Sequence, residues 1–137
     1  MDTVPTLSGG CACGAVRYEV KGRPCHRTLC HCADCRRAAG APAVAWFSVP
    51  LDALAYVRGA PALHRSSPPV ERGFCGRCGT QLTYRSDECP GEIDVTTCSL
   101  DDPEAAAPAD HTFAAQRLHW LNIADHLPAY AGTRSQG

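Results

Sequence analysis

The sequence has few aromatic residues, a single lysine and no long apolar run. Two tryptophans, four tyrosines and three phenylalanines are the only aromatic residues among 137, so the apolar core has to be modest. A chain with such a core gains from an additional staple, either metal or disulfide. Lys21 is the only lysine, the arginines are scattered and the net charge is −1, which argues against a basic stripe that follows a nucleic-acid backbone.

Membrane and export signals are also missing. No segment approaches the roughly 18 apolar residues of a membrane-spanning helix. The first ten residues have neither the basic start nor the apolar stretch of a secretory signal, so the expected location is the cytoplasm, where thiols stay reduced. The length fits one domain, residues 1–137, with a frayed tail over 131–137. Nothing in the sequence predicts the oligomeric state.

Cysteine, by contrast, is abundant, with ten residues. An even number of cysteines is typical of a disulfide framework in an exported protein. Here the export signal is absent, and the cysteines stand in C-x-C and C-x-x-C clusters. Cysteines so close in sequence form a disulfide only with strain, whereas they chelate one metal ion readily. The clusters therefore favour metal binding over disulfides.

Short alternating segments interrupted by glycine and proline predict a mostly β fold with short helical turns. Val16, Tyr18 and Val20 point to one face of the first such segment. The expected strands cover residues 15–20, 42–49, 80–84 and 93–97, with weaker candidates near Tyr56 and Leu63. Helical turns are expected over 34–39 before Gly40, at Asp102-Pro103 and over 122–126.

The first metal site is predicted from two pairs of cysteines that are far apart in the chain. Each pair is followed by a glycine, which lets the backbone turn its amides toward sulfur, as in a zinc knuckle. Two pairs together supply the four ligands of a closed structural zinc. This four-cysteine set comprises Cys11, Cys13, Cys75 and Cys78. Metal binding can offset the entropy cost of closing so long a loop.

A second set, the three-cysteine set, comprises Cys30, Cys32 and Cys35. Three ligands leave one position for an exchangeable fourth, as in catalytic zinc sites. Zinc on three thiolates is a weak Lewis acid, better suited to holding a thiolate than to splitting water. The alternative is a second closed site, completed by Cys25, Cys89 or Cys98.

Other residues near the three-cysteine set have two possible roles each. His31 stands between two ligands, so we expect it beside the site or at the surface rather than on the metal. The histidines at 26, 64, 111, 119 and 126 have no metal-ligand spacing and are expected to be solvated or held in the core. Arg36 and Arg37 could balance charge, bind a substrate carboxylate or simply form a solvated helix face. Trp46 and Phe47 could line a pocket, but alternation along the run places at least one in the core.

Three motifs, in this order, resemble the glutathione-dependent formaldehyde-activating enzyme family, which also includes centromere protein V. They are G-G-C-A-C-G-A-V-R-Y-E at 9–19, C-H-C-A-D-C-R-R-A-A-G at 30–40 and F-C-G-R-C-G-T at 74–80. The resemblance extends over about residues 7–130. It implies a β-tent of small antiparallel sheets, a structural zinc on the four-cysteine set and a catalytic zinc on the three-cysteine set. Cys98 departs from the small residue expected before S-L-D-D-P, and would close the second site if it reached the metal.

The resemblance implies a carbon–sulfur lyase that binds glutathione or another thiol and promotes its adduct with formaldehyde or a related small aldehyde. Its partners would be small molecules. Two other interpretations remain open. One is a non-catalytic interaction module with two structural zinc sites, and the other is a redox-sensing or metal-buffering protein that uses the surplus cysteines 25, 89 and 98.

Overall fold

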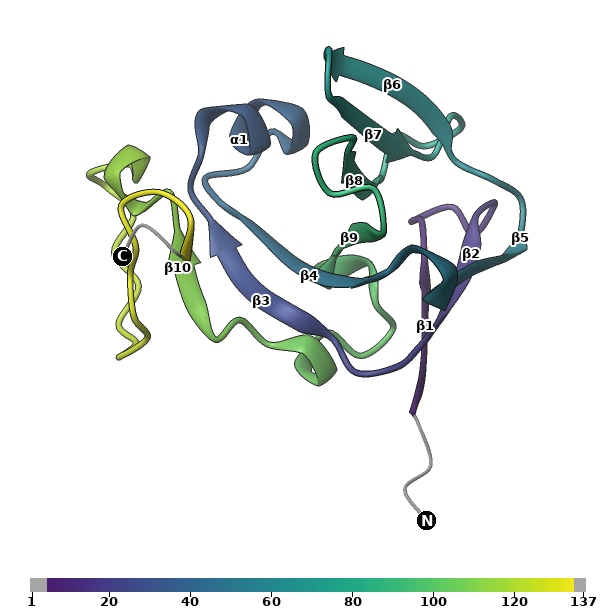
Figure 1. Cartoon of the computed structure of the whole chain (residues 1–137), viewed down its shortest axis with the longest axis horizontal. Coiled ribbons are helices and arrows are strands. Elements are labelled where there is room, and N and C mark those ends of the chain that lie inside the picture. Colours follow the sequence, from purple (N-terminus) through teal and green to yellow (C-terminus); the bar gives the residue numbers. More distant parts are fainter. Residues whose placement is uncertain (1–4, 135–137) are drawn as a thin grey trace.

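A computed structural model describes residues 5–134, and strands dominate it (Figure 1). The strands are β1 Thr6–Gly10, β2 Arg17–Lys21, β3 Cys25–Cys30, β4 Val44–Pro50, β5 Leu54–Arg58, β6 Ala62–Ser67, β7 Val70–Phe74, β8 Gln81–Ser86, β9 Glu92–Thr96 and β10 Asp110–Thr112. The helices are α1 Ala33–Ala39 and the 3-10 turns η1 Leu51–Ala53, η2 Thr97–Ser99, η3 Pro103–Ala106 and η4 Ala114–Gln116. The predicted mostly β fold is confirmed.

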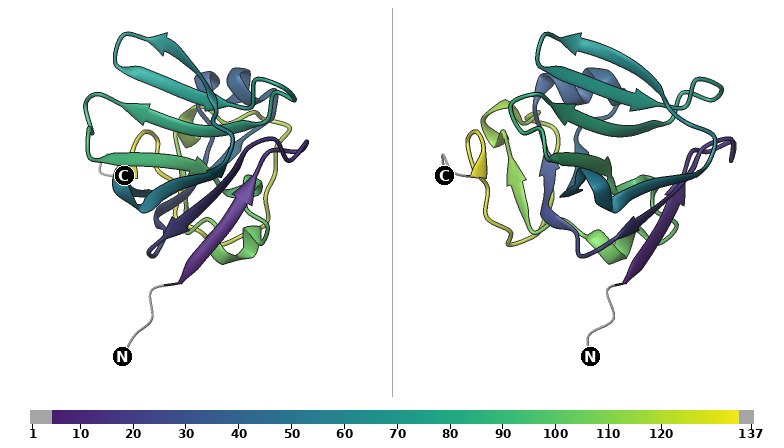
Figure 2. Two further views of the ribbon diagram at one scale, coloured as in Figure 1. Left: turned by 90° about the vertical axis from the view of Figure 1, so that its right-hand side faces the viewer. Right: turned by 45° about the vertical axis from the view of Figure 1, so that its right-hand side comes forward.

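Two sheets organise the chain. The smaller has the order β1-β2-β5, and the larger has the order β10-β3-β4-β9-β8-β7-β6. Every pairing is antiparallel except that of β10 with β3. The larger sheet is strongly curved (Figure 2), and on its concave side α1 lies beside the β6–β7 hairpin (Figure 1).

The main core joins side chains from both sheets. It contains Tyr18 and Val20 of β2 together with Phe47 and Val49 of β4. Val16, Tyr18 and Val20 are all buried, as the alternation predicted. Two metal-ligand candidates, Cys11 and Cys75, belong to the same cluster, so the predicted staple is part of the core.

One predicted helical turn is wrong. Residues 122–126 have no helical structure, and the nearby turn lies over residues 119–120. The Asp125 carboxylate accepts hydrogen bonds from the backbone N–H of Leu127, at 3.1 Å, and from the His111 ring, at 2.9 Å. Such a side-chain bond to the following backbone competes with helix formation. Within residues 5–134, no helix is long and apolar enough to span a membrane.

The segment expected to fray is attached where the structure describes it. The Phe113 N–H donates to the Gly132 carbonyl at 2.8 Å. The Arg134 Nε donates to Asp110 Oδ2 at 2.6 Å. Residues 131–134 are therefore bound to β10 and its surroundings, while residues 135–137 of the predicted tail lie outside the described residues.

Strand β1 of the smaller sheet leaves no room for a side chain at Gly9. A Cβ at Gly9 would lie 2.5 Å from the Ser99 carbonyl oxygen and 2.5 Å from the Tyr18 hydroxyl. Because one neighbour is backbone, Gly9→Ala should lower the free energy of unfolding by about 1–3 kcal/mol. Gly91→Ala is the matched control, since nothing lies within 4 Å of its Cβ position. Chemical denaturation of both variants checks this, and equal losses would contradict it.

Candidate metal centres and the adjoining pocket

The four-cysteine set is brought together from two turns of the chain. One turn joins β1 to β2 and the other joins β7 to β8. All four sulfur atoms lie within 4.8 Å of one another. The Cys13 and Cys75 sulfurs, from different turns, are 3.8 Å apart. The group can therefore hold one metal ion.

Both turns have the backbone form of a knuckle. Gly14 and Gly79 adopt left-handed conformations, with φ of 79° and 84°. The Val16 N–H donates to the Cys11 sulfur at 3.2 Å, and the Cys78 N–H donates to the Cys75 sulfur at 3.4 Å. Amide donors of this kind favour the thiolate form that a metal requires.

The three-cysteine set lies where β3 meets α1. Cys30 ends the strand, Cys32 caps the helix and Cys35 sits in its first turn. The Cys32 sulfur accepts a hydrogen bond from the Cys35 N–H at 3.3 Å, so the ligand also serves as the helix cap. The three sulfurs lie within 4.8 Å of one another. Gly40, with φ of 61°, ends the helix as predicted.

Protons are shared unequally within this set. Hydrogen bonding from Cys30 and then from Cys35 lowers the pKa of Cys32 to about 2. Hydrogen bonding to Cys32 raises the pKa of Cys30. One thiolate is thus already stabilised by its neighbours, which is the state that binds a cation.

No fourth ligand completes the three-cysteine set from residues 5–134. Neither a further cysteine nor a histidine, aspartate or glutamate adds a ligand atom to the group. Cys98, in η2, is exposed, as are Cys25 and Cys89. The closure by Cys98 that the sequence left open does not occur.

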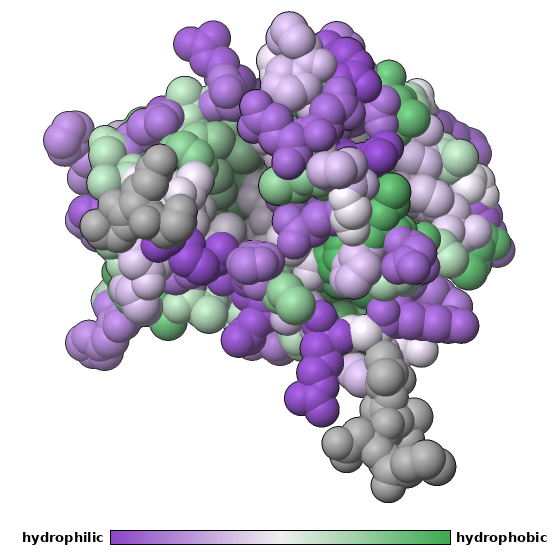
Figure 3. All heavy atoms as spheres, in the orientation of Figure 1, coloured by the Kyte–Doolittle hydropathy of each residue, from purple (hydrophilic) through white to green (hydrophobic). Residues whose placement is uncertain are grey.

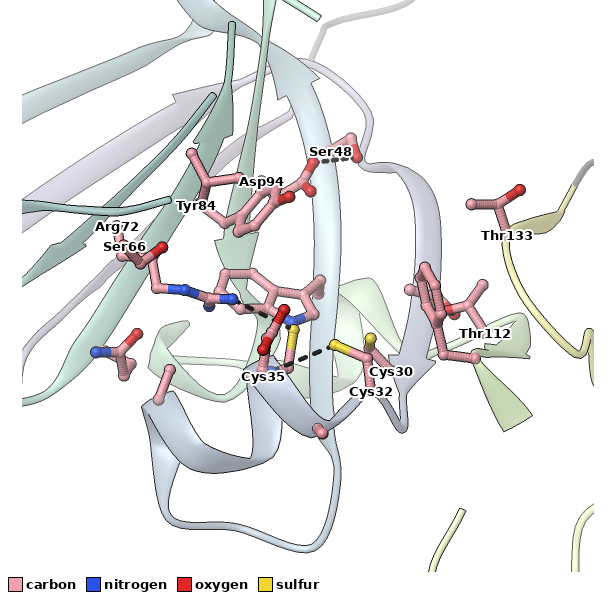
Figure 4. Close-up of a pocket in the computed structure, with 18 of the residues that line it drawn as sticks. Cys30, Cys32, Cys35, Ser48, Ser66, Arg72, Tyr84, Asp94, Thr112 and Thr133 are labelled. Carbon is pink, nitrogen blue, oxygen red and sulfur yellow. Dashed lines mark hydrogen bonds between the residues drawn. The ribbon is translucent and has the colours of Figure 1, made fainter. Parts of the chain in front are cut away.

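A cavity of about 1260 Å³ adjoins the three-cysteine set and is lined by all three of its members. The concave face of the larger sheet contributes to its lining (Figure 4). The strand register aligns four polar or charged residues in one row across this face: Arg72, Tyr84, Asp94 and Ser48. In the space-filling view, the surface is hollowed between α1 and the β6–β7 hairpin (Figure 3).

Asp94 is a carboxyl group held on the cavity wall. Its Oδ1 accepts a hydrogen bond from the Ser48 hydroxyl at 2.6 Å. Burial raises the pKa of Asp94 to about 6. A carboxyl group with that pKa exchanges protons near neutral pH, which is typical of binding and catalytic sites.

Arg72 is, besides Asp94, a charged residue of the site that the sequence did not reveal. Its side chain is buried, its Nη2 lies 3.9 Å from the Cys35 sulfur, and its Cζ lies 5.0 Å from the centre of the Tyr84 ring. The strand V-E-R-G-F carries no motif that would have drawn attention to it. The register between β7 and β8 places Arg72 opposite Tyr84, and the Arg72 side chain reaches the Cys35 sulfur from there.

His31 is completely buried, so the surface alternative for it is wrong. Its Nε2 lies 2.9 Å from Nδ1 of His111, and His111 Nε2 lies 2.9 Å from the Asp125 carboxylate. Burial, together with His111, lowers the pKa of His31. These contacts connect the three-cysteine set to β10 and to the C-terminal segment that contains Asp125. His111 is buried, which is one of the two roles expected for it.

The other candidates divide as follows. Trp46 is buried and lines the cavity, whereas Phe47 is buried in the main core. This confirms the prediction that at least one of the two packs in the core. Arg36 donates from Nε to the His31 carbonyl at 3.3 Å. Arg37 is exposed and lines the cavity.

The Asp94 pKa predicts a pH dependence of stability. The pKa of Asp94 is about 6 in the folded protein and 3.8 in the unfolded chain. Protonated Asp94 therefore favours the folded state, an effect that is fully present below pH 3.8 and is lost as the pH rises through about 6. Between pH 5 and 7 the wild-type protein should lose about 1 kcal/mol of unfolding free energy relative to Asp94→Asn. The variant keeps an oxygen that accepts the Ser48 bond. Denaturation curves at several pH values measure this, and parallel profiles would contradict it.

Comparison with known proteins agrees with these features. Residues 6–116 match the model of the family described as glutathione-dependent formaldehyde-activating enzyme. A Halomonas elongata protein provisionally named as such an enzyme is 29% identical over an alignment of 127 residues, and the match covers 85% of this chain and 80% of the relative. A crystal structure of a Rhodobacter sphaeroides protein is similar in fold, with a TM-score of 0.57 and 23% identity, covering 89% of this chain and 98% of the other. Because the family model spans most of the chain, this protein belongs to the glutathione-dependent formaldehyde-activating enzyme family.

Proposed function

We propose that the protein binds a thiol such as glutathione at the three-cysteine set and promotes its addition to formaldehyde or a related small aldehyde. The observation that carries the proposal is the position of three sulfurs on the wall of a large cavity, with no fourth ligand from residues 5–134. Catalytic metal sites keep one position for a substrate or water, whereas structural sites are closed. The name of the family points to the same chemistry.

The donor atoms of both cysteine sets fit zinc, which favours thiolate ligands in groups of three or four. The four-cysteine set would hold a structural ion, and Cys30, Cys32 and Cys35 would hold a catalytic one. When bound there, zinc lowers the pKa of a coordinated thiol and so supplies a thiolate at neutral pH. The chain's own part is to fix the three sulfurs, through the Cys35 N–H and the Arg72 guanidinium.

The reaction is an addition that needs no oxidant or reductant. The substrate thiol gives up its proton, and a sulfur electron pair forms a bond to the carbonyl carbon. The π electrons of the carbonyl move to its oxygen, which takes up a proton to give the S-hydroxymethyl adduct. The reverse reaction breaks the carbon–sulfur bond without water or an oxidant, and an enzyme of this kind is classified as a carbon–sulfur lyase.

The cavity has surfaces suited to such a substrate. Trp46, Tyr84 and Phe113 pack with the cysteines and form an aromatic wall, whose rings would limit water beside the reacting atoms. Arg37 projects from α1 at the same cavity and could bind a carboxylate of a glutathione-like thiol. We also propose a location and an organisation for the protein. All ten cysteines are free of disulfides, which suits the reducing cytoplasm. We propose that the chain forms a single domain there and has no nucleic-acid partner.

The two cysteine sets should differ in their effect on folding. We expect two zinc ions per chain by elemental analysis, one of them lost first to a chelator. Cys75→Ser should abolish folding, because Cys75 is both a ligand of the four-cysteine set and a member of the main core. Cys32→Ser should stay folded, by circular dichroism, with one zinc. Cys98→Ser is the matched control and should keep two. An unfolded Cys32→Ser protein would argue that both sites are structural.

Catalysis can be tested by the exchange rate between free glutathione and its hydroxymethyl adduct, measured by nuclear magnetic resonance at equilibrium with formaldehyde. The zinc-loaded protein should accelerate exchange, and Cys32→Ser should reduce the accelerated part by about 100-fold or more. Cys98→Ser, which alters an exposed cysteine outside the cavity lining, should match wild type. Equal rates with and without protein would reject the activity and favour a non-catalytic zinc module.

A further inference from the structure

Arg72 is a buried cation without an anionic side chain beside it. The residue is only 6% exposed. Its Nη1 is buried and has no hydrogen-bond partner, and within residues 5–134 no carboxylate lies within ion-pair distance of its guanidinium. A buried charge is costly unless an opposite charge compensates it. The site must therefore contain another source of negative charge.

The three-cysteine set can provide that charge. The Cys35 sulfur is the acceptor that Arg72 Nη2 approaches, at 3.9 Å, and Figure 4 shows the guanidinium directed toward it. The other neighbour is the Tyr84 ring, whose face also attracts a cation. A divalent ion on three thiolates has a formal charge of about −1, and a fourth thiolate would make it about −2.

We propose that Arg72 is the charge partner of the three-cysteine set, a positioning residue that makes this site accept a fourth ligand that is anionic. The inference rests on the proposed function and adds the type of ligand that the site selects. A fixed cation beside the sulfurs favours a thiolate over a neutral ligand, because it attracts the negative charge that the thiolate adds. A neutral ligand adds no charge and gains nothing from the guanidinium.

The two arginines nearest in sequence do not provide this charge. Arg36 lies next to Cys35 in the helix, but its Nε binds the His31 carbonyl. Arg37 is exposed, so solvent screens its charge. Arg72 is buried, and at this distance an unscreened cation has a much larger effect.

Cobalt-loaded protein tests the proposal without measuring turnover. Cobalt(II) absorbs visible light according to its ligands, so its spectrum reports addition of a fourth one. The probes are 2-mercaptoethanol, which has no charge other than that of its thiolate, and imidazole, which is neutral. They are titrated into the wild type, Arg72→Gln, Arg72→Lys and the control Arg58→Gln, which removes an exposed cation that does not line the cavity.

Arg72→Gln should weaken 2-mercaptoethanol binding by about tenfold or more, while imidazole binding changes less than about threefold. Arg72→Lys should restore thiol binding to within about threefold of wild type, and Arg58→Gln should stay within about twofold. Unchanged thiol binding in Arg72→Gln, or equal losses for both probes, would overturn the charge role. If Arg72→Gln does not fold, Arg72→Lys decides, since a loss above about tenfold there would point to shape rather than charge.

The same titration separates this inference from the proposed function. A wild-type cobalt spectrum that does not respond to thiol would reject the proposed thiol site, and the inference with it. A wild-type response that persists unchanged in Arg72→Gln would reject only the role of Arg72.

Discussion

The meeting of two distant turns at the four-cysteine set is the constraint on which the rest of the structure depends. The Cys13 and Cys75 sulfurs belong to residues 62 positions apart, yet lie 3.8 Å from each other. Cys11 and Cys75 are also members of the main core. With so few aromatic residues available, the core and the staple have to form together. The smaller sheet is thereby held against the larger one, whose other face is left for the cavity.

Because side chains alternate along each strand, one face of the larger sheet packs in the main core and the other lines the cavity. In β4, Phe47 and Val49 enter the main core, while Trp46 and Ser48 face the cavity. A strand held by packing on one side makes a rigid support for the residues on the other. The row from Arg72 to Ser48 is therefore positioned by hydrogen-bonded strands rather than by a loop.

Much of the fold and both cysteine sets could be predicted because the signals are local. C-x-C and C-x-x-C spacings keep ligands in one turn, and period-two alternation identified the strand that carries Tyr18. Arg72 and Asp94 could not be predicted as neighbours of one cavity, since β7 and β9 are separate in sequence and only the register aligns them. The helical turn over 122–126 failed because Asp125 binds His111 and a following backbone amide instead.

By itself, the sequence determined the two cysteine pairs and the cysteine triad, and how many ligands each contributes, because residues within one turn stay close together. The union of the two pairs in one four-cysteine set was predicted from the ligand count, but it is a contact between distant turns that the tertiary structure makes. Only the tertiary structure decided what lies around those groups. It left Cys98 exposed and outside the three-cysteine set, and it brought Arg72 within 3.9 Å of the Cys35 sulfur. The physical reason is that contacts between distant segments depend on sheet order and register, which no local spacing encodes.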